Sequence, residues 1–364
     1  MARVLFLDPY HGPSHQTLST ALRDRSRHDV TLLTLPPHKW KWRMRGAALA
    51  LESQARALPP PDILVCTDML NLPEFLALLR DHAPRLRAIS YFHENQLTYP
   101  IASQDERDIH FGLTNIHTAL ASDRVVFNSA FHRDEFLTAV ANLIKTMPDQ
   151  RPADIPGRIR SRSHVLGPPL DLPALVRPKE NLILWNHRWE DDKDPQAFFR
   201  VMRRLDRAGA DFRLLVMGER FRRVPACFEE ARTDLAHRIE HWGFIADRLD
   251  YLGQVAPCRF VVSTARHEFF GLSAREAIAL GCMPLLPRRV VYPELVGGRS
   301  ECLYDDEEDL FQRLTCALAD PGARCPADLR ADIASHTVTR VVSQWDDWFD
   351  ELSPERTSRR PAPA

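Results

Sequence analysis

Residues 260–286 read FVVSTARHEFFGLSAREAIALGCMPLL, and this stretch decides the fold. An apolar run, Phe260–Ser263, is followed by a polar loop, by a helix-forming segment that ends at Gly281, and by a second apolar run, Met283–Leu286. Two apolar strands joined through a helix predict a parallel sheet, because parallel neighbours need a crossover connection and are covered on both faces. The stretch is typical of one unit of a parallel α/β domain.

The same alternation continues in both directions from this stretch. Short apolar strands and amphipathic helices take turns in two consecutive arrays. The sequence therefore predicts an α/β protein of two doubly wound, Rossmann-like domains that face each other across a cleft, with ligands outside the carboxyl ends of the strands. The expected strands are 3–7, 30–35, 63–67, 88–92, 124–128 and 164–166, then 182–185, 212–217, 239–242, 260–263, 283–286 and 302–304. The expected helices are 16–26, 46–57, 73–81, 105–122 and 131–145, then 195–208, 225–236, 246–253, 273–280 and 306–319.

The chain length of 364 residues agrees with two domains. We expect an N-terminal domain over residues 1–170 and a C-terminal domain over residues 171–336, with a hinge in the stretch 167–175. An amphipathic helix over 337–352 is expected to pack back across the domains. The tail, residues 353–364, has too little apolar surface to fold and is expected to be flexible.

Composition narrows the classes of function. The 48 Lys and Arg residues against 49 Asp and Glu residues give a net charge of −1, so a polyanion would have to be bound by a local patch. No apolar run approaches the roughly 18 residues of a membrane span, and the N-terminus reads as a strand rather than a signal peptide. Seven scattered cysteines without a Cys-x-x-Cys pair favour reduced thiols. We therefore expect a cytoplasmic protein with no membrane partner and no metal cluster.

The loop and helix after residue 263 form the first candidate site. Glu268 lies in the loop and Glu276 on the helix, so both carboxylates can project into one pocket and accept hydrogen bonds from the hydroxyls of a sugar and a ribose. The N–H groups at the start of this helix, after Gly271 at Leu272 and Ser273, suit a phosphate. A capped helix with two solvated glutamates is the alternative, and the spacing alone does not decide between them.

A charged loop, WNHRWEDDKDP over residues 185–195, follows the first strand of the second domain. Arg188 offers a bidentate fork and Lys193 a point charge, so the two can clamp a diphosphate. The acidic residues at 190–192 would neutralise part of this charge, and a solvated loop is the alternative. In combination with the paired glutamates of the same domain, the loop predicts a nucleotide diphosphate site.

A third candidate is the loop DPYHGPSH, residues 8–15, after the first strand. A tight turn at Gly12 lets the backbone approach a phosphate or an acceptor, beside Tyr10, Ser14 and His15. The loop is not G-x-G-x-x-G, so it does not support a nicotinamide-binding domain. Its two histidines could also be a zinc pair, but no third ligand is in sight.

A fourth candidate is SYFHENQLTYP, residues 90–100, where a strand runs straight into polar residues. Such residues are costly to bury unless they bind something, which makes Glu94 and Asn95 candidates for acceptor contacts. His93 could donate or accept a hydrogen bond at a sugar hydroxyl or at the leaving phosphate. The alternative is a loop histidine whose polar atoms are satisfied by its neighbours.

The segment HKWKWRMR, residues 38–45, combines four fixed positive charges with two indoles. Basic side chains neutralise phosphates and indoles stack on unpaired bases, so the segment predicts an RNA-binding patch. A second basic run lies at 151–162. The alternatives are a solvated helix face whose tryptophans anchor it to the core and a helix lying on a membrane surface. The candidate RNA-binding residues are Lys39, Trp40, Lys41, Trp42, Arg43 and Arg45.

Several of these motifs together resemble one family. Glu268 and Glu276 stand at the E-x7-E spacing of retaining GT-B glycosyltransferases, especially family 4. YFHENQLTYP, WNHRWEDDKDP, the early Tyr-x-Gly-x-Ser-His pattern and Tyr292-Pro293-Glu294 are similar to the tRNA-queuosine alpha-mannosyltransferases, from about residue 3 to about residue 350. The loop after the first strand departs from the pattern, with His11-Gly12-Pro13 where the family is richer in glycine.

The resemblance implies a GT-B fold and transfer of mannose from GDP-mannose to the queuosine base at the wobble position of an aspartate tRNA. It implies that Glu268 contacts the donor sugar, that Glu276 contacts the nucleotide ribose, and that Arg188 and Lys193 bind the diphosphate. His93 matches a histidine that family 4 proteins often carry. With cationic side chains at the diphosphate in place of a metal, we expect a metal-independent enzyme without a cofactor. The alternatives are a family 4 enzyme that acts on a lipid or a small metabolite, and a catalytically silent protein that binds RNA or a nucleotide sugar.

Overall fold

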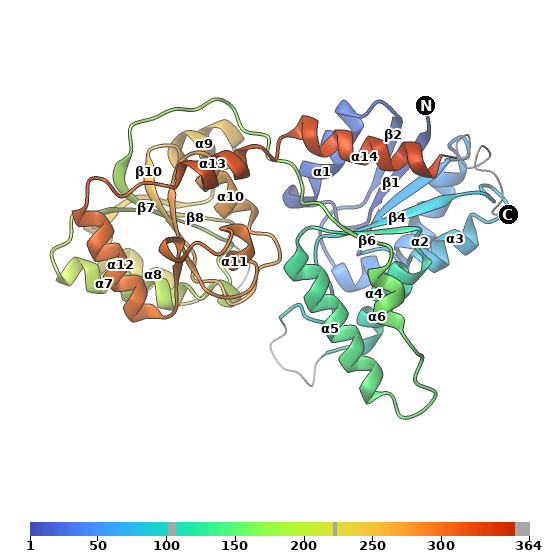
Figure 1. The fold of residues 1–364 in the computed structure, drawn as a ribbon, viewed down its shortest axis with the longest axis horizontal. Coiled ribbons are helices and arrows are strands. Elements are labelled where there is room, and N and C mark those ends of the chain that lie inside the picture. The colour runs from blue at the N-terminus through green and yellow to red at the C-terminus, as the bar shows by residue number, and fades with distance from the viewer. Residues whose placement is uncertain (101–106, 221–223, 354–364) are drawn as a thin grey trace. The chain divides into compact units, whose positions relative to one another are not determined.

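The computed structural model describes residues 1–100, 107–220 and 224–353 (Figure 1). The chain divides into two compact units, one of residues 1–171 with the C-terminal residues from 336 onward, the other of residues 172–335. The first crossing between the units, at residues 171 and 172, falls inside the stretch expected to be a hinge. The tail expected to be flexible lies, from residue 354 onward, outside the described residues, as do the first two residues of the helix expected over 105–122.

The first unit is built on a parallel sheet that has six strands within the described residues, in the order β2-β1-β3-β4-β5-β6. Alternate side chains of a strand face opposite sides of a sheet. In β1, Val4 and Phe6 pack into one apolar cluster and Leu5 and Leu7 into another, so the four central residues of the strand are all apolar. The strands are β1 (Arg3–Asp8), β2 (Asp29–Thr34), β3 (Ile63–Thr67), β4 (Arg87–Phe92), β5 (Arg124–Phe127) and β6 (Ser163–Val165).

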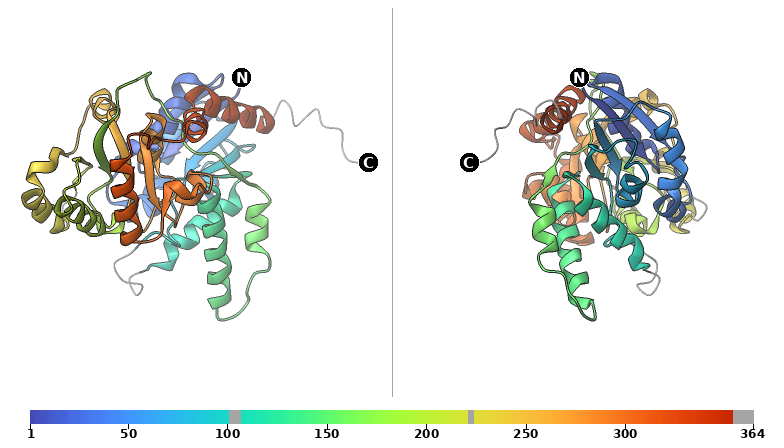
Figure 2. Two further views of the ribbon diagram at one scale, coloured as in Figure 1. Left: turned by 60° about the vertical axis from the view of Figure 1, so that its left-hand side comes forward. Right: turned by 90° about the vertical axis from the view of Figure 1, so that its right-hand side faces the viewer.

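Helices cover both faces of this sheet. The cluster around Val4 contains residues of α1 (Pro13–Arg25) and α14 (Val338–Leu352), whereas α2 (Trp40–Arg56) and α3 (Leu72–Leu78) pack on the opposite face. Buried Trp345 and Phe349 of α14 belong to the first cluster, and α14 lies alongside α1 (Figures 1 and 2). The C-terminal helix therefore returns to the first unit and completes its core. The remaining helices of the unit are α4 (Ile109–Ala121), α5 (Ala130–Thr146) and α6 (Ile155–Arg160).

The second unit has a parallel sheet of its own, with six strands in the order β12-β11-β10-β7-β8-β9 among the described residues. Its core is rich in aromatic rings, and Trp189 stacks on Phe228 with 4.1 Å between the ring centroids. The strands are β7 (Glu180–Asn186), β8 (Arg213–Met217), β9 (Ile239–Gly243), β10 (Cys258–Val262), β11 (Met283–Pro287) and β12 (Leu303–Tyr304). The helices are α7 (Pro195–Arg207), α8 (Cys227–Asp234), α9 (Arg248–Val255), α10 (Leu272–Ala279), α11 (Tyr292–Leu295), α12 (Glu307–Ala319) and α13 (Ala327–Ala334).

The predicted strands are all present, with ends that differ from the expected ones by no more than two residues. The predicted start of the second helix at residue 46 is wrong: α2 begins at Trp40, because Met44 at its first turns already packs into the unit. The short helices α6, α11 and α13 are not predicted by the sequence patterns; α6 and α11 have only six and four residues, too few to show a helical period, and no expected element covers α13.

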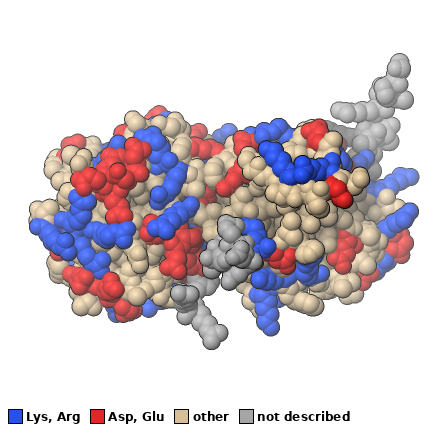
Figure 3. Space-filling model, turned by 90° about the horizontal axis from the view of Figure 1, so that it is seen from below, with Lys and Arg blue, Asp and Glu red and all other residues tan. Residues whose placement is uncertain are grey.

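None of the helices in the described ranges carries an apolar stretch long enough to cross a bilayer. Basic and acidic side chains are interspersed over the face seen from below (Figure 3), in agreement with the net charge of −1. Any attraction for a polyanion therefore depends on local groups of residues rather than on the charge of the whole chain.

Candidate active site

In the second unit, the loop between β10 and α10 wraps around the carboxylate of Glu268. Its Oε1 accepts hydrogen bonds from three successive backbone N–H groups, of residues 269–271, at 3.2, 3.4 and 3.1 Å. Burial alone would raise the pKa of Glu268, but the ammonium of Lys193, the His187 ring and the last of these N–H groups lower it to about 2. Glu268 is therefore ionised at neutral pH and fixed in the loop.

Gly271 turns the chain from this loop into α10. Its φ of 75° is the left-handed conformation that favours glycine, and a Cβ atom there would come within 2.9 Å of Leu295 Cδ1. Among the described residues, the N–H groups of Leu272 and Ser273 have no hydrogen-bond acceptor. The start of α10 thus presents unpaired donors at the positive end of an eight-residue helix, which suits a phosphate.

Lys193 is buried beside Glu268, in the 3₁₀ turn Asp191–Lys193 that follows β7. Its Nζ donates to the backbone carbonyl of His267 at 2.7 Å and lies 3.1 Å from Asp192 Oδ2 and 3.5 Å from Glu268 Oε2. Only 7% of the side chain is exposed. The loop after β7 and the loop after β10 are therefore tied together by one ammonium group, at the carboxyl ends of two neighbouring strands.

The other predicted diphosphate ligand, Arg188, differs from Lys193 in its surroundings. Its side chain is 43% exposed, and its guanidinium lies 3.2 Å from Glu190 Oε2. The same loop contains the buried ring of His187, whose pKa is lowered to about 4 by burial and by the charge of Lys193. The loop thus holds a buried fixed cation, a neutral histidine and an arginine that solvent reaches.

Glu276 lies on α10, almost fully buried. Its Oε1 accepts a hydrogen bond of 2.5 Å from Arg248, at the start of α9. Burial raises the pKa of Glu276, although Arg248 and the hydroxyl of Tyr251 oppose the rise. Asn186 at the end of β7 donates to the same Tyr251 hydroxyl at 2.9 Å and to the Ser273 carbonyl at 3.0 Å. The structure brings both predicted glutamates and Lys193 to the carboxyl edge of one sheet.

In the first unit, the loop after β1 closes around the carboxylate of Asp8, which is fully buried. Nδ1 of His11 lies 2.9 Å from one oxygen, and Nδ1 of His15 lies 3.1 and 3.2 Å from the two oxygens. Thr67 at the end of β3 also donates to Asp8, at 3.3 Å. Burial would raise the pKa of Asp8, but the neighbouring imidazoles, above all His15, hold it well below its usual range.

The predicted His93 lies on this cluster, because β4 ends directly beside β3. Its ring stacks on His15, with 3.7 Å between centroids and an angle of 11° between the planes. Asp68, after β3, accepts the backbone N–H of His93 at 2.9 Å, and Asn128 donates to the His93 carbonyl at 2.9 Å. Nε2 of His93 and Oδ2 of Asp68 are buried and have no hydrogen-bond partner within the described residues.

The remaining predicted acceptor residues have different roles in the local structure. Asn95 is fully buried and its Oδ1 accepts the N–H groups of residues 97 and 98, so its contacts are those of a turn-forming residue. Glu94 accepts a hydrogen bond from Gln96, and its charge is the second cause, after burial, that raises the pKa of Asp68 to about 8. In the loop before α1, Tyr10 donates its N–H to Asp8, Gly12 is the N-cap and Ser14 is exposed.

The predicted RNA-binding segment forms the beginning of α2, and its two tryptophans differ. Trp40 packs on Phe111 of α4, with 5.0 Å between ring centroids, and anchors the helix. Trp42 is 65% exposed. Lys39, Lys41 and Arg45 are exposed, whereas Arg43 donates to the Pro36 carbonyl at 3.3 Å. The second basic run is partly structural, since Arg162 donates to the carbonyls of residues 120 and 122 at the end of α4.

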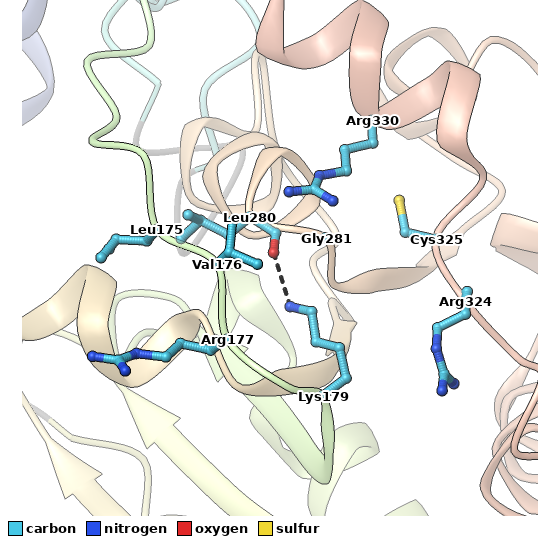
Figure 4. Close-up of a pocket in the computed structure, with 9 residues that line it drawn as sticks. All are labelled: Leu175, Val176, Arg177, Lys179, Leu280, Gly281, Arg324, Cys325 and Arg330. Carbon is cyan, nitrogen blue, oxygen red and sulfur yellow. Dashed lines mark hydrogen bonds between the residues drawn. The ribbon is translucent and has the colours of Figure 1, made fainter.

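A cavity of about 180 Å³ lies at the opposite, amino edge of the second sheet (Figure 4). Lys179 reaches into it and donates to the carbonyls of residues 256, 258 and 280, and Arg330 donates to that of residue 279. The guanidinium groups of Arg177 and Arg324 point away from its centre (Figure 4). The cations at the centre satisfy backbone carbonyls, most of them at the ends of α9 and α10, so we assign this cavity a structural role.

Sequence reasoning missed several residues of both clusters. Asp8 and Asp68 each stand at or directly after the end of a strand, which is a signal that the sequence contains, but an isolated acid in a loop does not reveal its partners. Arg248 is far from Glu276 in the sequence, and only the folded chain brings the two side chains into hydrogen-bond contact. Among the described residues no group of three or more His, Cys, Asp or Glu side chains is placed to hold a metal ion.

Comparison with known proteins agrees with this geometry. Residues 180–320 match the family described as glycosyl transferases group 1. Solved structures with the same fold include sucrose-phosphate synthase from Thermosynechococcus elongatus, with a TM-score of 0.72 and 15% identity over 97% of this chain and 99% of that one. Another is HepE of Anabaena in complex with UDP and glucose, with a TM-score of 0.67 and 15% identity over 96% and 100%. The chain is thus a glycosyltransferase of the GT-B fold.

Matches at the level of sequence show to which family of glycosyltransferases the chain belongs. Residues 3–170 match the family described as tRNA-queuosine alpha-mannosyltransferase N-terminal. The tRNA-queuosine alpha-mannosyltransferase of Drosophila melanogaster is 33% identical over 329 residues, which are 85% of each chain. A GDP-mannose-dependent phosphatidylinositol dimannoside mannosyltransferase of Mycobacterium tuberculosis is 27% identical over 92% of this chain and 77% of that one. The chain belongs to the tRNA-queuosine alpha-mannosyltransferase family.

Proposed function

We propose that this enzyme transfers mannose from GDP-mannose to the queuosine base at the wobble position of an aspartate tRNA, with retention of the anomeric configuration. Family membership supports the queuosine acceptor. The donor assignment depends on one observation: Glu268, Lys193 and unpaired N–H donors lie together around the start of α10. This group offers positive charge for a diphosphate and a fixed carboxylate for sugar hydroxyls in one place.

The donor's diphosphate is assigned to the start of α10, with Lys193 and Arg188 on its other side. Lys193 is held by a backbone carbonyl and two carboxylates, so it is oriented before the donor arrives and needs little reorganisation. Glu276 is assigned to the ribose hydroxyls, where it would exchange one contact with Arg248. Glu268, ionised at neutral pH, orients the mannose hydroxyls.

The reaction proceeds by cleavage of the bond between the mannose anomeric carbon and the GDP oxygen. Positive groups at the diphosphate stabilise the charge that develops on the leaving GDP, while the sugar becomes oxocarbenium-like. The acceptor hydroxyl forms the new bond to the anomeric carbon from the face that GDP leaves. Its proton passes to the leaving phosphate oxygen, so atoms and charge balance without a metal, a cofactor or a separate base.

The first unit is assigned to the acceptor. The exposed indole of Trp42 and the basic side chains Lys39, Lys41 and Arg45 provide stacking and phosphate contacts for the tRNA. Trp40 anchors the helix that presents them. The loop cluster of Asp8, His15 and His93 provides polar contacts at the reacting hydroxyl groups through its histidines.

The test is to incubate the protein with GDP-mannose and queuosine-containing aspartate tRNA and to analyse the nucleosides by mass spectrometry. A hexose-sized mass gain on queuosine that is lost in Glu276→Ala supports the donor, the acceptor and the site together. Release of GDP without modified nucleoside rejects the acceptor and directs the search to lipid or metabolite acceptors. Binding of donor and tRNA with neither product would indicate a silent binding protein.

A further inference from the structure

The loop cluster of the first unit contains two histidines in unusual contact. Imidazole rings of His15 and His93 stack face to face at 3.7 Å, at an angle of 11°. Two imidazolium ions at this distance would repel each other in a buried site, so only one ring can carry a charge. The surroundings of the two rings decide which one it is.

His15 is the ring that carries the charge. Its Nδ1 lies between the two oxygens of Asp8, at 3.1 and 3.2 Å, and Asp8 is fully buried. Burial lowers the pKa of His15, but the charge and hydrogen bond of Asp8 outweigh it, with smaller contributions from Asp68 and Glu94, and raise the pKa. A buried carboxylate without a cation would be costly, so Asp8 and His15 stabilise each other as an ion pair.

His93 is the ring that stays neutral. Burial and then the charge of His15 lower its pKa well below the usual value, with smaller effects of Asp8, which raises it, and of His132 and His11, which lower it. Its backbone is held on both sides, by Asp68 at the N–H and by Asn128 at the carbonyl. The rings of Tyr91 and His93 are nearly perpendicular, with 4.6 Å between their centroids.

Three buried polar atoms of this arrangement make no hydrogen bond within the described residues: Nε2 of His93, Oδ2 of Asp68 and the hydroxyl oxygen of Tyr91. A buried ring nitrogen without a partner costs free energy, and a ligand that supplies the missing hydrogen bond removes this cost. A neutral ring can donate or accept at this atom according to its tautomer, whereas an imidazolium can only donate.

We propose that Asp8 and His15 are positioning residues that hold the His93 ring in place and neutral, so that its Nε2 hydrogen-bonds a hydroxyl group of the substrate. The inference rests on the proposed function in assigning His93 to substrate contact. Asp8 acts only through the two imidazoles. Its carboxylate stabilises the positive charge on His15. Because the two rings are stacked, this charge repels a second positive charge on His93 and disfavours its protonation.

The direct test is a titration of histidine ring nitrogens by NMR in the full-length protein labelled with ¹⁵N-histidine, with assignments from His15→Gln and His93→Gln. In the wild type, the His15 signal should titrate above, and the His93 signal below, the ordinary histidine pKa. In Asp8→Asn, His15 loses its counter-ion and should become neutral near pH 7. In the wild type, the charge of His15 lowers the pKa of His93 more than Asp8 raises it. Losing both charges should therefore raise the pKa of His93.

Two control variants separate positioning from folding. Thr67→Val removes a neutral hydrogen bond to the same carboxylate, at 3.3 Å, and should leave both histidine titrations unchanged. Asp8→Glu keeps the charge and should restore the order of the two pKa values. In mannosyl transfer assays, the fall of kcat at low pH reports protonation of His93. This acid limb of the pH profile should move to higher pH in Asp8→Asn but not in Thr67→Val.

The inference is overturned if wild-type His93 titrates above His15, or if Asp8→Asn and Thr67→Val change the two titrations alike. It is also overturned if Asp8→Asn shifts the titrations while the kcat profile of an active enzyme keeps its acid limb. A protein that transfers no mannose to any queuosine tRNA contradicts the proposed function instead. In that case the NMR titration still decides whether Asp8 sets the charges of the two rings.

Discussion

The substitution Lys193→Met tests the role of the buried ammonium group in the stability of the second unit and in donor binding. The ammonium group is buried, bonded to the His267 carbonyl at 2.7 Å and within 3.5 Å of two carboxylates, whose side chains are 16% and 21% exposed. Methionine fills much of the same volume without the charge, so Asp192 and Glu268 lose their shared cation. Removing one member of a buried ion pair typically costs about 3–5 kcal/mol.

For a unit of the size of residues 172–335, a loss of this magnitude corresponds to a fall in Tm of roughly 10 °C. Differential scanning calorimetry should show this fall in the transition that GDP-mannose stabilises. Isothermal titration should show donor binding weakened by about 10-fold or more, the value of a hydrogen bond to a charged group. Lys145→Met removes an exposed lysine of the first unit and is the matched control. If Lys193→Met equals this control in both Tm and donor affinity, the assignment of Lys193 is wrong.

Three further predictions follow from particular contacts. Glu268 has its pKa lowered from 4.5 to about 2, so it contributes about 3 kcal/mol of stability above pH 4.5 that is lost as the pH falls toward 2. The unfolding free energies of wild type and Glu268→Gln should therefore converge in acid, and a constant difference would contradict the pairing. Trp345→Ala empties a fully buried position of α14 and should destabilise the first unit by about 3–5 kcal/mol, measured by urea unfolding, while donor affinity in the second unit stays unchanged. Trp42→Ala should weaken tRNA binding by about 5- to 150-fold in filter-binding assays without lowering Tm, because this indole is 65% exposed. Trp40→Ala should instead lower Tm. The opposite result for the two tryptophans would show that Trp42 does not contact the RNA.

The sequence was sufficient for the features that depend on short-range patterns. Strands such as Ile63–Thr67 could be placed within two residues, since a parallel strand buried on both faces reads as a nearly continuous apolar run. The motif residues could also be found from local patterns. Glu268 and Glu276 lie on a loop and a helix start that follow one strand, and Arg188 and Lys193 lie in the loop after another strand. Parallel strands end at the same edge of a sheet, so these residues had to come close to each other.

Tertiary structure alone decided which atoms are already engaged. Whether Lys193 is buried depends on the His267 carbonyl and on Glu268, more than seventy residues away in the chain, and that pairing follows from β7 and β10 being neighbours in the sheet. The partnership of Asp8 with His15 and His93 likewise requires β1, β3 and β4 to lie side by side. A local pattern specifies which residue types end each strand, whereas charge state and hydrogen bonding depend on burial and on partners that only the folded chain brings within a few ångströms.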